Sequence, residues 1–556
     1  MKVGTAIAEI LKREGVSIIC GYPLNYIIDY AAAIDVRPVI TRAERIAGHM
    51  ADAISRMTSG KTIGVYVTQH GPGIENGMGA VAVAYGESIP MLVLPMGYLR
   101  SDSFVAPHFN SSISLRSFTK SVEPVLFGKD VPDIMRRAFS RLRNGRGGPV
   151  VVEIPIDVWH EEVPEPLEYT PVCATRYAPD PAAARRAAEM LVAARRPVMY
   201  AGQGVHFAEA WPQLRRLAET LALPVLTSLE GKSAFPETHE LALGAAGLTM
   251  PRTVHHFVEQ ADLVFGIGCS FTKTSFGLRM PRGKTVIHAT LDPAHLDNET
   301  PVTLGLIGDA ALTLEALQVE VERLLGGRPR DSRDVAAEIK TVHEAWLAEW
   351  MPKLTSDETP LTPYRVIWDL YHAVDVANTV ITHDAGSPRD QLAPFWKCTQ
   401  PLTYLGWGKT THLGYGLGLA MGAKLARPEK LCINVWGDAA IGFTGMDFET
   451  CVRERIPILS ILFNNFCMAM ETPVMGVSGR KYGTTEISGD YAAMARAFGG
   501  YGERVTDTAQ IIPAIRRAIE QTHKGVPALL EFITCRELAA SRMNKSFYVA
   551  ALPEPV

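Results

Sequence analysis

Short apolar runs and amphipathic stretches alternate along the first third of the chain. Residues 16–23, 62–69 and 91–97 are rich in branched apolar side chains, which is typical of buried strands. Between them, residues 43–60 place small and apolar side chains on one helical face, at Ala43, Ala47, Met50, Ala51 and Ile54. This alternation predicts a parallel sheet with helices on both faces, the doubly wound α/β arrangement.

Two polar segments divide the chain into three blocks of this kind. Residues 161–181 and 355–365 combine Pro with acidic residues, a composition typical of linkers. We therefore predict three doubly wound parallel-sheet domains, at residues 1–165, 183–330 and 360–535. Residues 536–556 form a C-terminal tail that we expect to become ordered only against a neighbour.

The composition argues against several classes of function. The 556 residues carry a net charge of −4, so no basic excess indicates a nucleic-acid partner. The apolar runs are too short to cross a bilayer, and the N-terminus reads as an amphipathic helix without a cleavage site. The eight cysteines lie far apart, with no C-x-x-C pair, which indicates reduced thiols. We therefore expect a cytoplasmic protein without a membrane or nucleic-acid partner.

The stretch from Gly437 to Asn465 holds the clearest candidate chemistry. An apolar strand at residues 431–436 leads to Asp438, a small-residue turn and a helix at residues 444–455 follow, and a second strand leads to Asn465. Neighbouring parallel strands end at one crevice, so we expect the carboxylate and amide oxygens to lie together there. Such oxygens suit Mg²⁺ bound together with phosphates. Taken singly, each residue is more often a turn or capping residue.

This stretch resembles the diphosphate-binding motif of thiamine diphosphate (ThDP) enzymes, in which Gly-Asp-Gly is followed after a couple of dozen residues by Asn-Asn. Here Ala439 stands in place of the second Gly. The resemblance implies that Asp438, Asn465 and the backbone carbonyl of Cys467 bind Mg²⁺. It also implies a set of cofactor-binding residues: Glu44, Gly386, Ser387, Leu413, Gly437, Asp438, Ala439, Ala440, Asn465 and Met470.

Glu44 and Leu413 each have two interpretations. Thr41 and Glu44 fit the capping-box pattern at a helix start, so Glu44 can be a structural cap. The family resemblance implies instead that Glu44 hydrogen-bonds the aminopyrimidine ring of ThDP and promotes its proton exchange, and we favour this interpretation. Leu413 is either a core side chain or the bulky apolar residue that separates the two rings of the cofactor.

Four residues are candidates for catalysis on the substrate side of the site. Gln69 and His70 begin a Gly/Pro loop, residues 69–76, that resembles an active-site loop of the superfamily. His70 suits proton transfer near neutral pH, although a loop histidine is more often simply solvated. Asn25 lies in GYPLN, which resembles a Gly-Tyr-Pro-Gly-Gly turn of the acetolactate synthases, and Asn110 stands where those synthases have Gln.

The resemblance covers nearly the whole chain, in the order pyrimidine-binding, central and diphosphate-binding domains, and it is closest to the acetolactate synthase-like branch. It implies a ThDP- and Mg²⁺-dependent carboligase or decarboxylase that acts on a 2-oxo acid through a carbanion-enamine intermediate. It also implies a homodimer or homotetramer, because one cofactor contacts two subunits in this family. The loop CSFTKTSFG replaces an Arg-containing loop of the flavin-binding members, which argues against FAD.

Two other interpretations stay open. The chain departs from the synthases on the expected substrate side, which fits a lyase or simple decarboxylase of an acyl-CoA, a sulfonated aldehyde or an aryl 2-oxo acid. These departures are Leu24, Asn25, Asn110 and Val474. The change at Ala439 fits a non-catalytic relative with the same fold.

Overall fold

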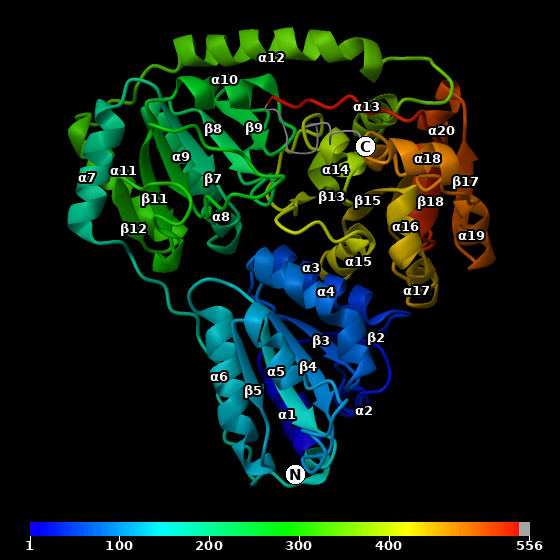
Figure 1. Cartoon of the computed structure of the whole chain (residues 1–556). Coiled ribbons are helices and arrows are strands. Elements are labelled where there is room, and N and C mark those ends of the chain that lie inside the picture. Colours follow the sequence, from blue (N-terminus) through cyan, green and yellow to red (C-terminus); the bar gives the residue numbers. More distant parts are fainter. Residues whose placement is uncertain (544–556) are drawn as a thin grey trace.

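The computed structural model describes residues 1–543, in which three six-stranded parallel sheets are each flanked by helices (Figure 1). The N-terminal domain fills the lower part of Figure 1, with the central domain at the upper left and the C-terminal domain at the upper right. This arrangement confirms the predicted fold class. No helix within residues 1–543 combines the length and the apolar character needed to cross a membrane.

The N-terminal sheet has the strand order β2-β1-β3-β4-β6-β5. Strands β3, β4 and β6 are buried along their whole length, as expected for parallel strands covered on both faces. The strands are β1 (Ile18–Gly21), β2 (Arg37–Ile40), β3 (Gly64–Thr68), β4 (Met91–Gly97), β5 (Ser121–Pro124) and β6 (Val150–Pro155). The helices are α1 (Val3–Arg13), α2 (Ile27–Ala32), α3 (Glu44–Met57), α4 (Pro72–Gly86), α5 (Ser111–Ser114) and α6 (Val131–Arg143).

The central sheet has the order β12-β11-β10-β7-β8-β9, which is the strand order of dinucleotide-binding folds. Its strands are β7 (Pro197–Ala201), β8 (Val225–Ser228), β9 (Ala242–Ala246), β10 (Leu263–Ile267), β11 (Thr285–Thr290) and β12 (Leu304–Ile307). Its helices are α7 (Pro181–Ala193), α8 (Gly204–Phe207), α9 (Trp211–Leu221), α10 (Arg252–Gln260) and α11 (Ala310–Leu324).

The C-terminal sheet has the order β14-β13-β15-β16-β18-β17, which repeats the N-terminal order when each domain is counted from its own first strand. Its strands are β13 (Thr379–His383), β14 (Tyr404–Leu405), β15 (Leu431–Gly437), β16 (Leu459–Asn464), β17 (Tyr501–Val505) and β18 (Ala528–Ile533). Its helices are α13 (Pro363–Ala373), α14 (Ser387–Leu392), α15 (Tyr415–Ala426), α16 (Asp438–Thr444), α17 (Phe448–Arg453), α18 (Gly476–Tyr482), α19 (Tyr491–Ala497) and α20 (Ile511–His523).

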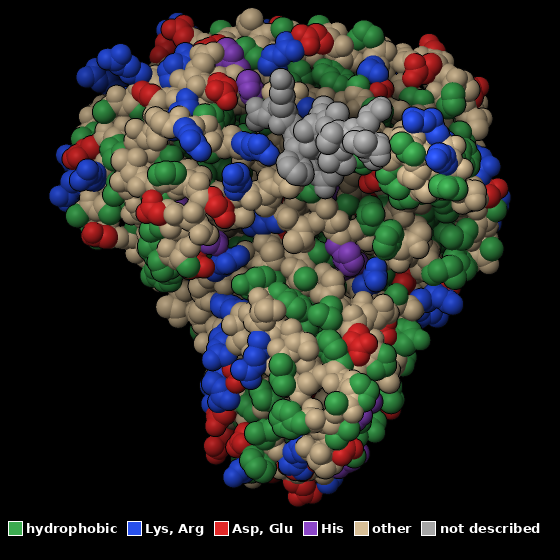
Figure 2. Space-filling model, in the orientation of Figure 1, with side chains coloured by type: hydrophobic (Ala, Val, Ile, Leu, Met, Phe, Trp, Pro, Cys, Tyr) green, Lys and Arg blue, Asp and Glu red, His purple; other side chains and the backbone are tan. Residues whose placement is uncertain are grey.

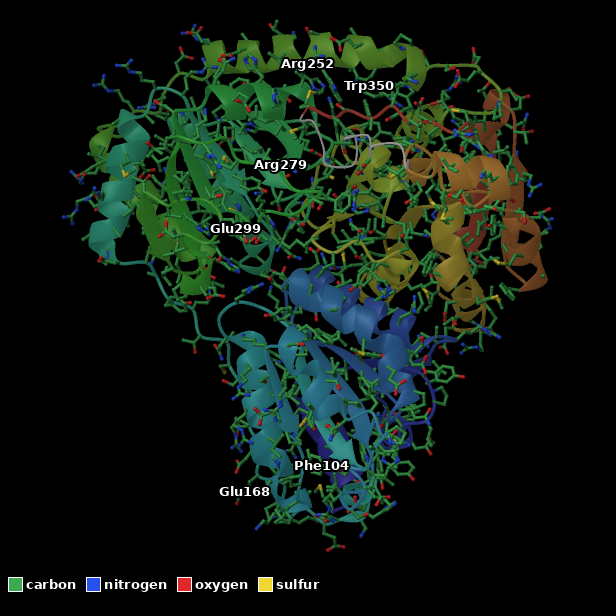
Figure 3. All side chains as sticks on the ribbon, in the orientation of Figure 1. Phe104, Glu168, Arg252, Arg279, Glu299 and Trp350 are labelled. Carbon is green, nitrogen blue, oxygen red and sulfur yellow. The ribbon has the colours of Figure 1, made fainter. Side chains whose placement is uncertain are left out.

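Helix α12 (Arg333–Leu354) runs across the top of the molecule from the central to the C-terminal domain (Figure 1). Trp350, labelled in Figure 3, comes from this helix. Its ring lies 4.9 Å from that of Tyr364 and 5.2 Å from that of Phe395, measured between centroids. This aromatic contact holds α12 against the C-terminal domain. Acidic and basic side chains are interspersed over the face shown in Figure 2.

Helix α3 of the N-terminal domain packs directly on α15 of the C-terminal domain (Figure 1). Every residue of α3 except Arg45 is buried. A side chain at Gly418 of α15 would overlap His49, and one at Gly422 would overlap the backbone of Met50. The two glycines therefore allow the close approach of the helices that joins these domains.

The segment after Asp438 differs from the prediction. We expected a small-residue turn and then a helix at residues 444–455, but α16 begins at Asp438 itself. The alanines that follow are strong helix formers, which explains the early start. The helix ends at Thr444, where φ is −143°, and α17 starts only at Phe448.

The first part of the C-terminal tail is held by its own chain. Ser541 accepts a hydrogen bond from the indole of Trp346 (2.9 Å) and donates one to the carbonyl of Met250 (2.7 Å). The Tyr364 hydroxyl donates to the carbonyl of Ala539 (2.6 Å). Residues 536–543 thus contact the central and C-terminal domains of their own chain. The rest of the tail, residues 544–556, lies outside the described residues.

Candidate functional site

Asp438 and Asn465 lie together at the carboxyl ends of β15 and β16. Asp438 is 4% exposed, and its Oδ2 accepts hydrogen bonds from the backbone N–H groups of Asn465 (3.1 Å) and Cys467 (3.2 Å). Burial raises the pKa of Asp438, although these N–H groups favour the carboxylate. The neighbouring Asn464 turns the other way, and its amide donates to Glu531 Oε1 at 2.7 Å. Only the second Asn of the pair therefore reaches the candidate site.

The oxygen atoms around Asp438 fit a hard divalent cation. The Oδ1 of Asn465 and the carbonyl of Cys467 each accept one hydrogen bond, from Cys467 N and Ala469 N, and each keeps a second lone pair. No cluster of three or more His, Cys, Asp or Glu side chains suited to a metal occurs within residues 1–543. A cation here would therefore depend on amide, carbonyl and phosphate oxygens, which is the donor set that Mg²⁺ accepts.

Ala439 does not require a glycine backbone. It lies in the first turn of α16 and is absent from the residues of positive φ in the described chain. Ala440 is buried, whereas Ala439 is half-buried. The replacement of glycine by alanine is therefore compatible with the backbone that the motif adopts here.

A second turn at the carboxyl end of β13 lies beside Met470. Gly386 has a φ of +84°, a conformation that disfavours other residues, and Ser387 begins α14 directly after it. A Cβ placed at Gly386 would lie 3.6 Å from Met470 Sδ. One wall of the crevice between β13 and β15 is therefore formed by Gly386, Ser387 and Met470. The strand order reverses between these two strands, and in such sheets ligands bind at this point.

Asp384 holds the turn that carries Leu413. It is fully buried, and its carboxylate accepts from the backbone N–H groups of Ala385 (2.8 Å), Gly414 (2.9 Å) and Gly416 (3.0 Å). Burial raises its pKa to about 6. Leu413 is half-buried and packs at the edge of the core that joins the N- and C-terminal domains. The sequence pattern did not indicate this positioning role of Asp384, because two of the N–H groups that it binds lie about 30 residues later in the chain.

Glu44 is not a helix cap. It is the first residue of α3, and the residue before the helix, Ala43, makes no side-chain capping bond. The Thr41 hydroxyl donates to the carbonyls of Gly21 and Ala43, not to the helix. The Glu44 carboxylate is 8% exposed and accepts from the amide of Asn76 at 2.5 Å. The structure therefore contradicts the capping-box interpretation and adds Asn76, which the sequence did not single out.

His70 belongs to an aromatic stack beside the loop at residues 69–76. Its ring meets that of Tyr98 edge to face at 4.7 Å, and Tyr98 stacks on His108 at 4.0 Å. Burial, and then the proximity of His108, lowers the pKa of His70. The Nδ1 atom of His70 is buried and has no hydrogen-bond partner within the described residues. The imidazole is therefore neutral near pH 7, with Nδ1 uncommitted.

The remaining candidates differ in whether their side chains already make hydrogen bonds within the protein. Gln69 is half-buried directly after β3. The amide of Asn25 donates to the carbonyls of Thr68 and Leu94, both at 2.9 Å, and its Oδ1 accepts from Ile27 N. Asn110 caps α5, where its Oδ1 accepts from Ile113 N at 3.1 Å. Asn25 and Asn110 thus make local structural contacts, and Asn25 supports the strand end that carries Gln69.

Two separate half-sites result. The hydrogen bond of Glu44 stays within the N-terminal domain, and those of Asp438 stay within the C-terminal domain. A different cavity, of about 470 Å³, lies between the central domain, near the carboxyl ends of its strands, and the N-terminal domain. Its lining includes Tyr200, Gly204, Gly268, Ser270, Thr290 and Asp309.

Comparison with known protein families agrees with this geometry. The thiamine pyrophosphate enzyme N-terminal TPP binding domain matches residues 1–103, the central domain matches residues 184–317, and the C-terminal TPP binding domain matches residues 384–532. The three matches follow the order of the three sheets. Fold and family matches together define a ThDP-dependent enzyme that acts on carbon–carbon bonds.

The chain is similar over almost its whole length to acetolactate synthase large subunits. It is 30% identical to a probable acetolactate synthase large subunit of Methanocaldococcus jannaschii, over 96% of this chain and 92% of that protein. It is 29% identical to the isozyme 3 large subunit of Escherichia coli, over 93% and 92%, and 29% identical to the large subunit of Haemophilus influenzae, over 94% and 92%. The chain belongs to the thiamine pyrophosphate enzyme family, in its acetolactate synthase-like branch.

Proposed function

We propose that the protein is a carboligase that joins the acyl part of one 2-oxo acid to a second carbonyl compound, using ThDP and Mg²⁺. The observation that carries this proposal is the buried Asp438 carboxylate beside Asn465 at two adjacent strand ends, in a chain similar throughout to acetolactate synthase large subunits. When bound, ThDP supplies the nucleophile and the electron sink for decarboxylation.

The residues of the C-terminal domain position the cofactor. Asp438, Asn465 and the Cys467 carbonyl would hold Mg²⁺ against the diphosphate. Backbone N–H groups for the phosphate oxygens would come from Gly386, from Ser387 and from Gly437, the residue before α16. Leu413, held by the Asp384 turn, would contact the rings from one side.

The residues of the N-terminal domain move protons. Glu44 would exchange a proton with the pyrimidine ring of ThDP, with Asn76 fixing the orientation of its carboxylate. His70 and Gln69 lie at the end of β3, where they would steer a proton or the acceptor carbonyl. Because His70 is neutral, its free nitrogen can accept a proton.

The two half-sites support a homodimer as the smallest active unit. Glu44 and Asp438 make their contacts in separate domains of one chain, so a second copy can bring the complementary half-site to each. A homotetramer built from two such dimers is equally compatible with this arrangement. We further propose that FAD is not required, since the loop at residues 269–277 has no arginine.

Simple decarboxylation is the second candidate, and His70 favours it. The imidazole stacked beside the loop can take up a proton at its free nitrogen and pass it on to the intermediate, in place of an acceptor carbonyl. In that case acetaldehyde, and not acetolactate, would be the product from pyruvate.

Two measurements test these proposals. We expect ThDP together with Mg²⁺ to raise the melting temperature. At a hundredfold excess of ligand over Kd, the free energy of unfolding should increase by about 2.7 kcal/mol. ThDP alone or Mg²⁺ alone should give a smaller increase. Pyruvate should then yield CO₂ and acetolactate. Absence of any stabilisation by ThDP and Mg²⁺ contradicts the cofactor assignment, whereas CO₂ with acetaldehyde alone supports the decarboxylase.

A further inference from the structure

A small cavity lies beside the candidate ThDP crevice and is closed by the C-terminal tail. It has a volume of about 240 Å³. One wall comes from α14 and from residues 470–474, and the other from residues 537–542. The lining residues include Ser387, Asp390, Met470, Val474, Leu538 and Arg542. Because Ser387 and Met470 also lie at the turn of Gly386, the cavity borders the candidate ThDP crevice.

The tail wall is fixed in place from two domains. Besides the contacts of Ala539 and Ser541, Lys353 forms an ion pair with Glu537, and Arg542 pairs through its backbone with Thr249 of the central domain. The wall therefore exists before any ligand binds, and a side chain on it is held in a defined position.

Most charges around the cavity are neutralised. Glu537 is paired with Lys353. Asp390 is 3% exposed and accepts from Arg389 Nε at 2.9 Å, while the Arg389 guanidinium lies 4.2 Å from the centre of the Phe276 ring. Among the described residues around the cavity, the cation left over is Arg542, so these residues carry a net positive charge at this end.

The guanidinium of Arg542 lacks hydrogen-bond partners within the described residues for part of its N–H groups. Within residues 1–543, the acidic atom paired with it is Asp390 Oδ2, 3.7 Å from Nη2, which is beyond a hydrogen bond. Its Nε is buried and has no hydrogen-bond partner within the described residues, and Asp390 Oδ2 is in the same state. Three quarters of the Arg542 side chain is buried, so these missing bonds destabilise the ligand-free protein.

We propose that this cavity binds the 2-oxo acid substrate, with its carboxylate held by the guanidinium of Arg542. The planar fork of arginine matches a carboxylate in two parallel hydrogen bonds, which would satisfy the buried Nε. Met470, Pro473, Val474 and Leu538 form an apolar wall for a short alkyl group. A cavity of this size lies below the range typical of larger ligands, which favours a small acid over an acyl-CoA.

This inference rests on the proposed function but is tested separately from it. The probe is oxamate, an unreactive carboxylate shaped like pyruvate, titrated by calorimetry into the full chain without ThDP. We expect Arg542→Gln to bind oxamate roughly 10- to 100-fold more weakly than the wild type, because a charged hydrogen-bond partner is lost. With ThDP and Mg²⁺, the same variant should show a raised KM for pyruvate.

Two further variants separate binding from folding. Arg542→Lys keeps the charge without the fork and should lose part of the affinity only. Arg517→Gln removes an exposed arginine that pairs with Glu503 on the far edge of the C-terminal domain, and it should bind oxamate as the wild type does. All three variants should keep the stabilisation by ThDP and Mg²⁺.

Several outcomes overturn the inference. One is equal oxamate affinity in the wild type and in Arg542→Gln; another is no oxamate binding by the wild type. Binding of isethionate, a small sulfonate, without binding of oxamate also overturns the carboxylate assignment. In each case intact stabilisation by ThDP and Mg²⁺ leaves the proposed function standing, while loss of that stabilisation in the wild type contradicts the proposed function itself.

Discussion

The N-terminal and C-terminal domains have the same strand order, yet they place different chemistry at the ends of equivalent strands. The third strand of the N-terminal domain, β3, leads to Gln69 and His70, whereas the third strand of the C-terminal domain, β15, leads to Asp438. In the C-terminal domain the fourth strand adds a candidate oxygen ligand, Asn465, whose backbone N–H donates to Asp438. The function proposed above would therefore use one topology for a proton-transfer half-site and a metal half-site, because function depends on the residues at the strand ends.

The helices that begin with the two candidate carboxylates, α3 and α16, also differ in the partners of those carboxylates. Glu44 at the start of α3 projects its carboxylate to Asn76 of the same domain. Asp438 at the start of α16 accepts from the backbone of the next strand end. The carboxylate at the start of α3 thus accepts from a side-chain amide, whereas the carboxylate at the start of α16 accepts from backbone N–H groups.

The largest expected effect comes from Glu44→Gln in the N-terminal half-site. We expect activity to fall by roughly 10²- to 10⁴-fold, since a proton-transfer group is lost, while Asn76 can still donate to the amide oxygen. Stabilisation by ThDP and Mg²⁺ should remain close to that of the wild type. Steady-state kinetics and melting temperatures with and without ThDP check this expectation.

Asp133→Asn is a matched control, because Asp133 also lies in the first turn of an N-terminal helix but is exposed. It should leave activity unchanged. An active but destabilised Glu44→Gln protein would assign Glu44 to structure and remove the functional contrast between the two domains.

The second-largest expected effect is a difference between variants of the two asparagines at the end of β16. Asn464→Ala removes a fully buried bond to Glu531 and should cost about 1–3 kcal/mol of unfolding free energy. Asn465→Ala should cost less than about 1 kcal/mol without ligands, but it should weaken stabilisation by ThDP in Mg²⁺. Urea denaturation at several Mg²⁺ concentrations measures both quantities.

Each asparagine variant is the control for the other. If both lose the Mg²⁺ dependence equally, the cation is not bound by Asn465 alone, and the half-site of the C-terminal domain must be assigned differently.

A smaller effect concerns the contact between the compared domains. Glu87, at the end of α4, is fully buried and accepts from the backbone of Gly408 (3.0 Å) and Lys409 (2.8 Å). Burial raises its pKa above the usual value of 4.5. The folded state therefore holds a proton that the unfolded chain releases, so stability from this group falls as the pH rises from 4.5 through the folded pKa.

Glu87→Gln keeps an acceptor for both N–H groups and removes the titration. We expect its melting temperature to depend less on pH between about pH 5 and pH 8 than that of the wild type, and to exceed it at the upper end. The exposed Glu520→Gln should follow the wild type. A lower melting temperature of Glu87→Gln at pH 8 would mean that Glu87 acts there as a charged partner of Arg56 or Lys409.

The smallest effect is expected at Ala439. Because this residue has helical backbone geometry, Ala439→Gly should lower the unfolding free energy by about 0.5–1 kcal/mol and change ThDP affinity by no more than about twofold. Titration of ThDP followed by intrinsic fluorescence checks this. A large gain in affinity would show that the alanine obstructs the diphosphate.

Much of the fold follows from local patterns. The apolar strands at residues 91–97 and 431–436 and the small-residue face of α3 are visible because period and composition act over a few neighbouring residues. The start of α16 was predicted wrongly for a related reason, since a run of small residues is compatible with both a turn and a helix.

The sequence by itself determined the α/β alternation, the family and the carboxylate and amide at two strand ends. Tertiary structure decided which asparagine contacts Asp438, that Glu44 accepts from Asn76 and caps nothing, and that Arg542 of the tail lines the small cavity with α14. The physical reason is the distance along the chain. Hydrogen bonds and ion pairs between residues about 30 to 150 positions apart depend on how sheets and helices pack, and no local pattern records them.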